Sequence, residues 1–320
     1  MSGIGKKIGK FVTLWKNFGA GIAFGELKSS LAHEGADKVR ADYVKHERVK
    51  KYLLKKYGYV VDKYRNMAPP HSEAIGSDAP IWIVWYQGEE NAPETVRMCI
   101  ESVRRHSGSH PVILLTRDSI GEYVKIPDHI TEKLESGSVT LTHFSDILRF
   151  ALLSQCGGIY LDATTLVTSD GAFCFDELPL YTCRTGIRPE LDVAKGLWVS
   201  YIFAGGKGNG LASYMTEMFS EYWKKEDKLI TYLLVDCAIA LAYENIPWVR
   251  EMIDSLPESN SEIYELEDNS RGPYSDDVYR RALSCPFHKM TYKRPHMCEC
   301  ADGTQTIYGR LTEDIKSGKL

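Results

Sequence analysis

The chain has 320 residues, of which 43% are hydrophobic and 26% charged, so it can bury a full core as one large or two smaller domains. This composition excludes a disordered or low-complexity protein, and no run reaches the roughly 18 apolar residues of a membrane-spanning helix. The net charge of −4 is divided unevenly: residues 1–66 hold 15 Lys and Arg against 6 Asp and Glu, and the remainder 24 against 37. A basic arm on an acidic body predicts an anionic neighbour, and a solvated basic helix is the alternative.

The eight cysteines lack the spacing of a zinc site or a disulfide framework, because no CxxC occurs and Cys298-x-Cys300 has no second pair. We interpret them as reduced, structural residues. The apolar piece at 17–25 is short and has no clear cleavage site, which argues against a signal peptide. These features favour a cytoplasmic protein.

The first 78 residues are expected to form a basic helical extension and a linker. Apolar residues recur at helical spacing with lysines between them, which indicates an amphipathic helix over 4–18. These apolar residues are Ile4, Ile8, Phe11, Val12, Trp15 and Phe18. A second helix is predicted at 34–57, and the Pro-, Gly- and Ser-containing segment 67–80 predicts a boundary near residue 78. We therefore expect an extension at 1–78, a main domain at 79–300 and a tail at 301–320.

Beyond the linker, short apolar strands alternate with helices. Strands are predicted at 81–87, 111–116, 159–161 and 200–206, and helices at 93–106, 143–156, 210–224 and 230–243. Near-continuous apolar strands separated by helices indicate an α/β fold whose mostly parallel sheet is covered on both faces.

Three charged residues lie within the apolar segment SDILRFALLSQCGGIYLDATT at 145–165. Asp146 and Arg149 share one face of a predicted helix, and Asp162 stands at the carboxyl end of a buried strand. A buried charge must be paired or bind a ligand. Pairing of Asp146 with Arg149 would satisfy that rule, but open α/β sheets bind their ligands at the carboxyl ends of strands. The three charges together predict a site for a polar ligand.

This segment resembles the S-D-x-x-R … G-G-x-Y-x-D-x-[DT] signature of the DXD sugar-nucleotide glycosyltransferases. That group includes capsular polysaccharide synthesis transferases, yeast initiating mannosyltransferases and clostridial glucosylating toxins. IVWYQG upstream looks like the first strand of the group, and SYIFAGGKGNGL, YWKKEDKLITYLLVD and FHKMTYK downstream look most like the capsular branch. The resemblance covers about 80–295 and leaves the first 78 residues outside.

The resemblance implies a GT-A-like fold and transfer of a hexose from a nucleotide sugar, with a UDP-sugar favoured. The acceptor would be a polysaccharide or a lipid-linked saccharide in capsule or surface polysaccharide synthesis, with retention of configuration. A non-catalytic nucleotide-sugar-binding protein with the same fold is the alternative. By position, Trp85 would stack on the base, Asp146 would hold hydroxyl groups of the ribose or donor sugar, and Arg149 would clamp the sugar or phosphate.

The resemblance also implies a divalent metal, Mn²⁺ or Mg²⁺, which Asp162 would bind and which would bridge the donor diphosphate. The second acid of the DXD motif is Thr164 here, so the hydroxyl of Thr164 or of Thr165 would ligate the metal directly or through water. His288 is a further candidate ligand, and Lys289 and Lys293 would bind the diphosphate. A solvent-exposed basic loop is the alternative for this last group.

Asp236 is the one charged residue of LLVDCAIA, so the argument made for Asp146 applies to it as well. We take Asp146, Arg149 and Asp236 as candidate catalytic residues. The stretch GGKGNG at 205–210 lacks a phosphate-loop spacing and is interpreted as a strand-to-helix turn that lets the backbone approach the sugar. Three tryptophans are interpreted as core residues: Trp82, Trp198 and Trp223.

The amphipathic stretch 4–18 predicts contact with an anionic membrane surface. Such contact would hold the protein at the inner face of the cell membrane, beside a lipid-linked acceptor. Packing of Ile8, Phe11 and Trp15 against the main domain is the alternative. Nucleic acid is not expected as a partner, because the body is acidic and the arm has few aromatic residues.

Overall fold

The computed structural model describes the backbone of residues 3–175, 178–186 and 193–320, and the side chains within these ranges from residue 5 onward. The side chain of Ile4, the first residue of the predicted apolar stripe, lies outside the described residues. The strands are β1 (Ile81–Val84), β2 (Val112–Leu115), β3 (Gly158–Asp162), β4 (Thr165–Val167), β5 (Leu180–Tyr181), β6 (Ile202–Gly205) and β7 (Phe287–Lys289). The helices are α1 (Gly3–Phe18), α2 (Ala20–Leu31), α3 (Ala36–Asn66), α4 (Glu94–His106), α5 (Ile120–Tyr123), α6 (Asp128–Glu135), α7 (Leu141–Gln155), α8 (Gly210–Lys225), α9 (Leu234–Asn245), α10 (Pro247–Asp254), α11 (Glu265–Asn269), α12 (Asp276–Ala282) and α13 (Ile307–Lys316).

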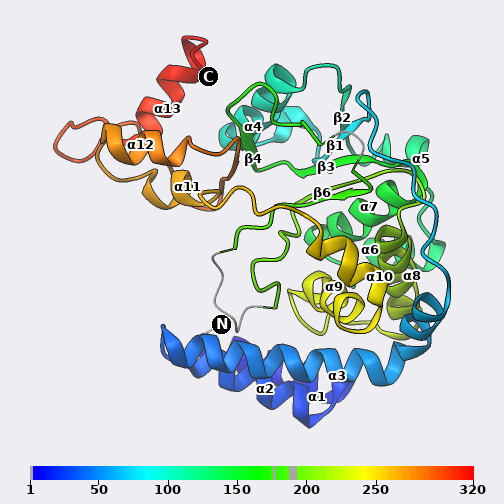
Figure 1. Cartoon of the computed structure of the whole chain (residues 1–320). Helices are drawn as coiled ribbons and strands as arrows, with labels where there is room; N and C mark the ends of the chain where they lie inside the picture. The colour runs from blue at the N-terminus through cyan, green and yellow to red at the C-terminus, as the bar shows by residue number, and fades with distance from the viewer. Residues whose placement is uncertain (1–2, 176–177, 187–192) are drawn as a thin grey trace.

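The central sheet has the strand order β2-β1-β3-β6-β5 (Figure 1). β1 is parallel to β2 and β3, whereas β6 is antiparallel to β3 and β5, so among the described strands of this sheet only β6 runs against the rest. The predicted α/β fold with a mostly parallel sheet and an N-terminal helical extension is therefore confirmed. The short strand β5 does not lie in an apolar run of the sequence, and it was not predicted.

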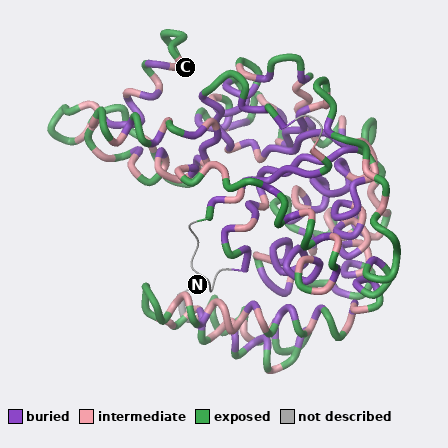
Figure 2. The backbone as a smooth tube through the Cα atoms, in the orientation of Figure 1, coloured by how far each residue is buried: buried purple, intermediate pink, exposed green. Residues whose placement is uncertain are grey.

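Alternate residues of β1 face opposite layers of the core. Trp82 and Val84 belong to the cluster that contains residues of α7, α8 and α9, whereas Ile81 and Ile83 cluster with residues of α4. Figure 2 shows the middle of the sheet as buried; β1 and β6 are buried throughout, whereas most of the edge strand β2 is of intermediate burial. A strand covered on both faces has no polar side, which explains the continuous apolar run at this position.

A second, small sheet continues from the carboxyl end of β3. β4 begins at Thr165, three residues after Asp162, and pairs antiparallel with β7, so that Thr165 lies opposite Lys289. Lys289 is therefore part of a strand, and the alternative of an exposed basic loop is wrong for this residue. The expected tail also has a fold, because α13 buries Ile307 and Leu311 against residues of α11 and α12.

The long helix α3 belongs to the main core. Its residues Val49, Leu53, Tyr57 and Val60 have no exposed surface and share one cluster with residues of α8 and α9. Figure 1 shows α3 running along α9, with α1 and α2 on its outer side. Acidic residues of the body pair with this helix: Lys50 with Glu244, Lys56 with Glu226 and Lys63 with Glu217. The body itself is thus one anionic neighbour of the basic arm.

The glycine-rich turn after β6 contacts the linker. A Cβ atom at Gly206 would lie 1.6 Å from the carbonyl oxygen of Glu73, and the Glu73 N–H donates to the Lys207 carbonyl at 3.2 Å. Only a residue without a side chain allows this approach. The interpretation of 205–210 as a turn is confirmed, but the backbone that approaches it is the linker, and the turn does not line the cavity described below.

Candidate active site

A cavity of about 580 Å³ opens at the carboxyl ends of β1 and β3. Side chains reach it from the residues after β1, from α7, from the end of β3, from the start of α9 and from β7. This is the edge where open α/β sheets bind ligands, because the strands end there and the connecting segments supply polar groups. All but one of the predicted site residues line this cavity: Trp85, Asp146, Arg149, Asp162, Thr164, Asp236, Lys289 and Lys293.

Arg149 joins two carboxylates at the floor of the cavity. Arg149 is 2% exposed. Its Nη1 donates to Asp146 Oδ1 at 2.9 Å, and its Nη2 donates to Asp162 Oδ1 at 3.0 Å. The guanidinium carbon lies 4.6 Å from the ring centroid of Tyr160. Burial acts to lower the pKa of Arg149, but Asp146, Tyr160 and Asp162 outweigh it and raise the pKa. Arg149 is therefore a fixed positive charge, paired with Asp146 and also presented to the cavity.

Asp162 also contacts a second cation. Lys289 Nζ donates to Asp162 Oδ2 at 2.7 Å and to Thr164 Oγ1 at 2.8 Å, and it lies 4.4 Å from the ring centroid of Tyr201. Burial acts to raise the pKa of the Asp162 carboxyl, but Lys289 and Arg149 together hold that pKa below its ordinary value. Asp162 is thus ionised at neutral pH, with one oxygen bonded to each cation.

His288 is the predicted site residue that the structure places elsewhere. Adjacent residues of β7 point to opposite sides, so Lys289 faces the cavity and His288 faces the protein interior. Its ring is fully buried, its Nε2 is 2.8 Å from Thr168 Oγ1, and burial lowers its pKa to about 4. This placement contradicts the expectation that His288 shares a metal with Asp162.

The residues around Asp162 do not fit the expected metal site. Both Asp162 oxygens and the Thr164 hydroxyl accept hydrogen bonds from Arg149 or Lys289, and the His288 ring points away. Within the described ranges, no group of three or more His, Cys, Asp or Glu side chains could hold a metal ion. A divalent cation could bind Asp162 only if Lys289 moved away. Otherwise the metal ion and the Lys289 ammonium would share the same oxygen atoms and repel each other.

Asp236 lies in the first turn of α9 and is 7% exposed. Its Oδ1 accepts a hydrogen bond from the indole Nε1 of Trp198 at 3.1 Å. Trp198 lines the cavity as well, so its interpretation as a core residue is only half right: the ring is buried, but its polar edge orients a carboxylate of the site.

Trp85 follows β1 and borders the cavity beside Tyr292, with ring centroids 5.5 Å apart in an edge-to-face arrangement. Its buried indole N–H has no hydrogen-bond partner among the described residues. An acceptor atom of a ligand that lies in the plane of the ring would satisfy this group. Stacking of a base on the ring face stays a prediction, because a stacked ring cannot accept a hydrogen bond from the in-plane N–H.

Six tyrosines of the cavity were missed by sequence reasoning: Tyr86, Tyr160, Tyr201, Tyr232, Tyr264 and Tyr292. A signal existed for Tyr160, because it precedes Asp162 by two residues in a strand and so lies on the same side. Tyr232 is 66% exposed at the cavity, and its position before α9 carries no pattern that marks it.

Comparison with known proteins bears on this site. The family model described as capsular polysaccharide synthesis protein matches residues 32–311. A solved structure titled PaToxG Glycosyltransferase is similar at a TM-score of 0.41 and 16% sequence identity, over 77% of this chain and 89% of that chain. No curated protein matches. The family match begins before α3 and ends within α13, so it is wider than the range of about 80–295 expected from the motifs. Because it spans well over half of the sequence, the chain belongs to the capsular polysaccharide synthesis protein family.

Proposed function

We propose that the protein is a glycosyltransferase with a GT-A-like fold that moves a hexose from a nucleotide sugar, a UDP-sugar in preference, to a polysaccharide or lipid-linked saccharide. The observation that carries this proposal is the cavity at the strand ends, in which Arg149 is held between Asp146 and Asp162 with Lys289 beside them. Family membership supports a role in capsule or surface polysaccharide synthesis. We propose retention of configuration on the resemblance of the motifs alone.

In the proposed reaction, an acceptor hydroxyl oxygen bonds to the anomeric carbon of the sugar while the bond from that carbon to the diphosphate breaks. Negative charge then develops on the departing nucleoside diphosphate. Arg149, Lys289 and Lys293 would stabilise that charge, because positive groups that are already in place need little reorganisation. Trp85 would stack on the base, and Asp146 would accept hydrogen bonds from ribose or sugar hydroxyls.

Asp236 would act at the sugar end of the cavity. Its carboxylate is oriented by Trp198, next to Tyr232, which also lines the cavity. A carboxylate there could bind hydroxyls of the donor sugar or receive the proton of the acceptor hydroxyl. The Mn²⁺ or Mg²⁺ implied by the resemblance would supply further positive charge to the diphosphate, but the residues around Asp162 do not fit such an ion.

A panel of UDP- and GDP-sugars tests the proposal. We expect one of them to raise the melting temperature of the wild-type protein and to lose its sugar when an acceptor is added. Trp85→Ala should weaken binding of that donor about 5- to 150-fold, the range for losing one base-stacking contact. Donor binding without transfer or hydrolysis would favour the alternative of a non-catalytic nucleotide-sugar-binding protein. A panel without any binding would overturn both.

We also propose that the outer face of α1 and α2 contacts an anionic membrane, which would place the cavity near a lipid-linked acceptor. Leu14 and Phe18 of α1 are buried in the main core, so one side of this helix is structural. The other side exposes an apolar patch with these exposed fractions: Ile8 59%, Val12 42%, Trp15 49% and, from α2, Phe24 51%. No helix in the described part of the chain is long and apolar enough to cross a membrane.

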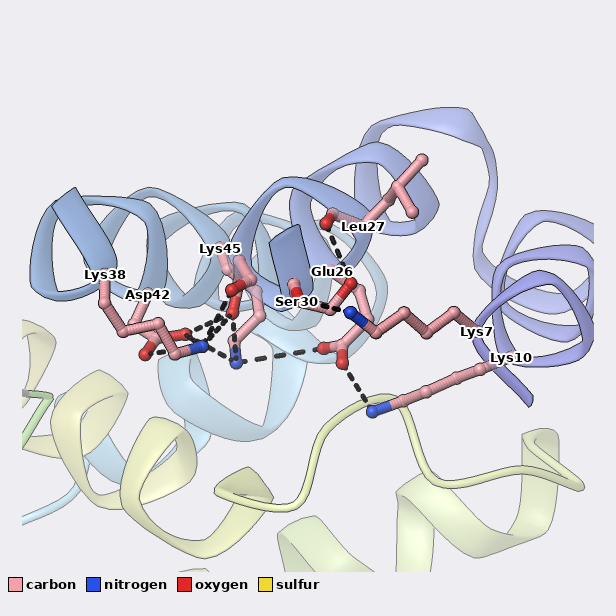
Figure 3. A network of polar contacts seen from close by, with 9 residues as sticks. Lys7, Lys10, Glu26, Leu27, Ser30, Lys38, Asp42 and Lys45 are labelled. Atoms are coloured by element: carbon pink, nitrogen blue, oxygen red, sulfur yellow. Dashed lines mark hydrogen bonds and ion pairs between the residues drawn. The ribbon is translucent and has the colours of Figure 1, made fainter. Parts of the chain in front are cut away.

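The lysines of the N-terminal helices also fall into two groups, those paired within the protein and those exposed on its surface. Lys10 and Lys45 contact Glu26, and Lys38 and Lys45 contact Asp42, so these charges are used within the helices (Figure 3). Four others are exposed on α1 and α2, of which Lys7 donates to the Ser30 carbonyl: Lys6, Lys7, Lys16 and Lys28. Lysines near an anionic leaflet contribute about 1 kcal/mol each to membrane binding, and the apolar patch would add burial among the acyl chains.

A triple variant in which serine replaces Ile8, Val12 and Trp15 should no longer sediment with anionic liposomes. The melting temperature should hardly change, because these side chains are exposed. Tyr123→Ser, at an apolar residue 39% exposed on α5, is the matched control and should leave sedimentation unchanged. Wild-type sedimentation of the triple variant would contradict the membrane proposal.

A further inference from the structure

Lys289 occupies the position where a bound cation is expected in a DXD site. Its ammonium group donates to both side chains that the motif offers, Asp162 Oδ2 and Thr164 Oγ1. An ammonium has three N–H donors, and these bonds use two of them. The group also lies within the lining of the cavity, so a ligand oxygen there can approach it.

The backbone holds Lys289 at this position. β7 pairs with β4 so that Lys289 is opposite Thr165, directly after Thr164. The N–H of Lys289 donates to the Ile263 carbonyl at 2.8 Å, and the N–H of Met290 donates to the Thr164 carbonyl at 2.9 Å. Hydrogen bonds thus fix the backbone at Lys289 and at the residue after it, to Ile263 and to Thr164, and only the side chain of Lys289 could move away.

The charges of Asp162, Thr164 and Lys289 also favour Lys289 as the cation of this site. Two carboxylates and a divalent cation sum to zero, and one carboxylate and one ammonium also sum to zero. Replacement of the second acid by Thr164 therefore matches replacement of a divalent cation by Lys289. Thr164 keeps an oxygen that accepts from the ammonium but adds no charge that would need a second compensation.

We propose that the Lys289 ammonium serves as the built-in cation for the donor diphosphate, so that nucleotide binding does not require a divalent metal. This inference rests on the proposed nucleotide-sugar function. Lys289 would use its remaining N–H to bind a phosphate oxygen while Asp162 and Thr164 hold the ammonium in place. Arg149, bonded to the other oxygen of Asp162, would keep that carboxylate oriented.

Calorimetric titration of UDP and of GDP in excess EDTA and in Mn²⁺ tests the inference. We expect at least one nucleotide to bind the wild-type protein with the same affinity in both solutions. Lys289→Met should weaken that binding in EDTA about 10- to 100-fold, the range for losing a hydrogen bond to a charged group. Lys55→Met on the exposed side of α3, which does not line the cavity, is the control for loss of one lysine and should bind as wild type.

A double variant tests whether the site can be converted back from a lysine to a metal ion. Thr164→Asp with Lys289→Met restores two acids and removes the ammonium, so nucleotide binding should now require Mn²⁺. Two results would overturn the inference and leave the proposed glycosyltransferase function unaffected. One is binding to the wild-type protein that is lost in EDTA and restored by Mn²⁺. The other is a folded Lys289→Met protein that binds nucleotide in EDTA with wild-type affinity. Absence of binding of either nucleotide under all conditions would overturn the proposed function itself.

Discussion

Asp162→Asn is expected to reduce sugar transfer about 100- to 1000-fold, the range for losing one preorganised electrostatic contact in an active site. The carboxylate binds Arg149 through one oxygen and Lys289 through the other. An amide keeps the shape but removes the negative charge, so the two cations would repel each other and lose their common orientation. Turnover of the donor identified in the panel, measured at saturating concentration, checks this result.

The fold should survive this change. Asp162 stands at the edge of the cavity with 29% of its side chain exposed, so water can reach the new amide. Arg149→Ala, by contrast, should lose both activity and stability, because it leaves the largely buried Asp146 without its guanidinium partner. Equal melting temperatures of wild type and Asp162→Asn are therefore required before the loss of transfer is assigned to the site.

Glu226→Ala should lower the free energy of unfolding by about 3–5 kcal/mol, the range for removing one partner of a buried ion pair. One carboxylate oxygen of Glu226 accepts from Tyr52 at 2.7 Å, from Lys56 at 2.6 Å and from Tyr57 at 2.9 Å. Glu226 is 5% exposed and Tyr57 is fully buried, so the variant leaves a buried hydroxyl without an acceptor. Urea unfolding measures the change.

Glu217→Ala is the matched control for this contact between α3 and the body. Glu217 also pairs with a lysine and a tyrosine of α3, Lys63 at 2.6 Å and Tyr64 at 3.1 Å, but 29% of its side chain and 57% of that of Lys63 are exposed. Exposed pairs of this kind contribute at most about 1 kcal/mol. An equal loss of stability in the two variants would contradict the assignment of Glu226 as the central contact of α3.

The central sheet and the floor of the cavity were predictable because their signals are local. β1 and β2 are continuous apolar runs, and the turn from α7 into β3 is made by Gly157 and by Gly158, the first residue of β3, which both have positive φ angles. Asp146, Arg149 and Asp162 stand out because charge is rare in such a segment. Position at the end of a strand then indicates that these residues meet, and the structure confirms that they do.

The other contacts depend on pairings between distant parts of the chain. Whether Lys289 or His288 faces the cavity is set by the register of β7 on β4, more than a hundred residues away, and a shift of one residue would exchange them. In the same way, the lysines of α3 look like a surface for an external anion until their partners Glu226 and Glu244 are placed beside them. A helix with a basic face does not indicate by itself whether its neighbour lies within the same chain.

Release of nucleoside diphosphate from the panel of nucleotide sugars, with and without a saccharide acceptor, tests whether this cavity transfers sugar. We expect the wild-type protein to consume one donor, the acceptor to accelerate this reaction, and Asp162→Asn to consume the donor at least about 100-fold more slowly. Failure of the wild type to consume any donor, or consumption by folded Asp162→Asn at the wild-type rate, would contradict the assignment of this cavity as a glycosyltransferase active site.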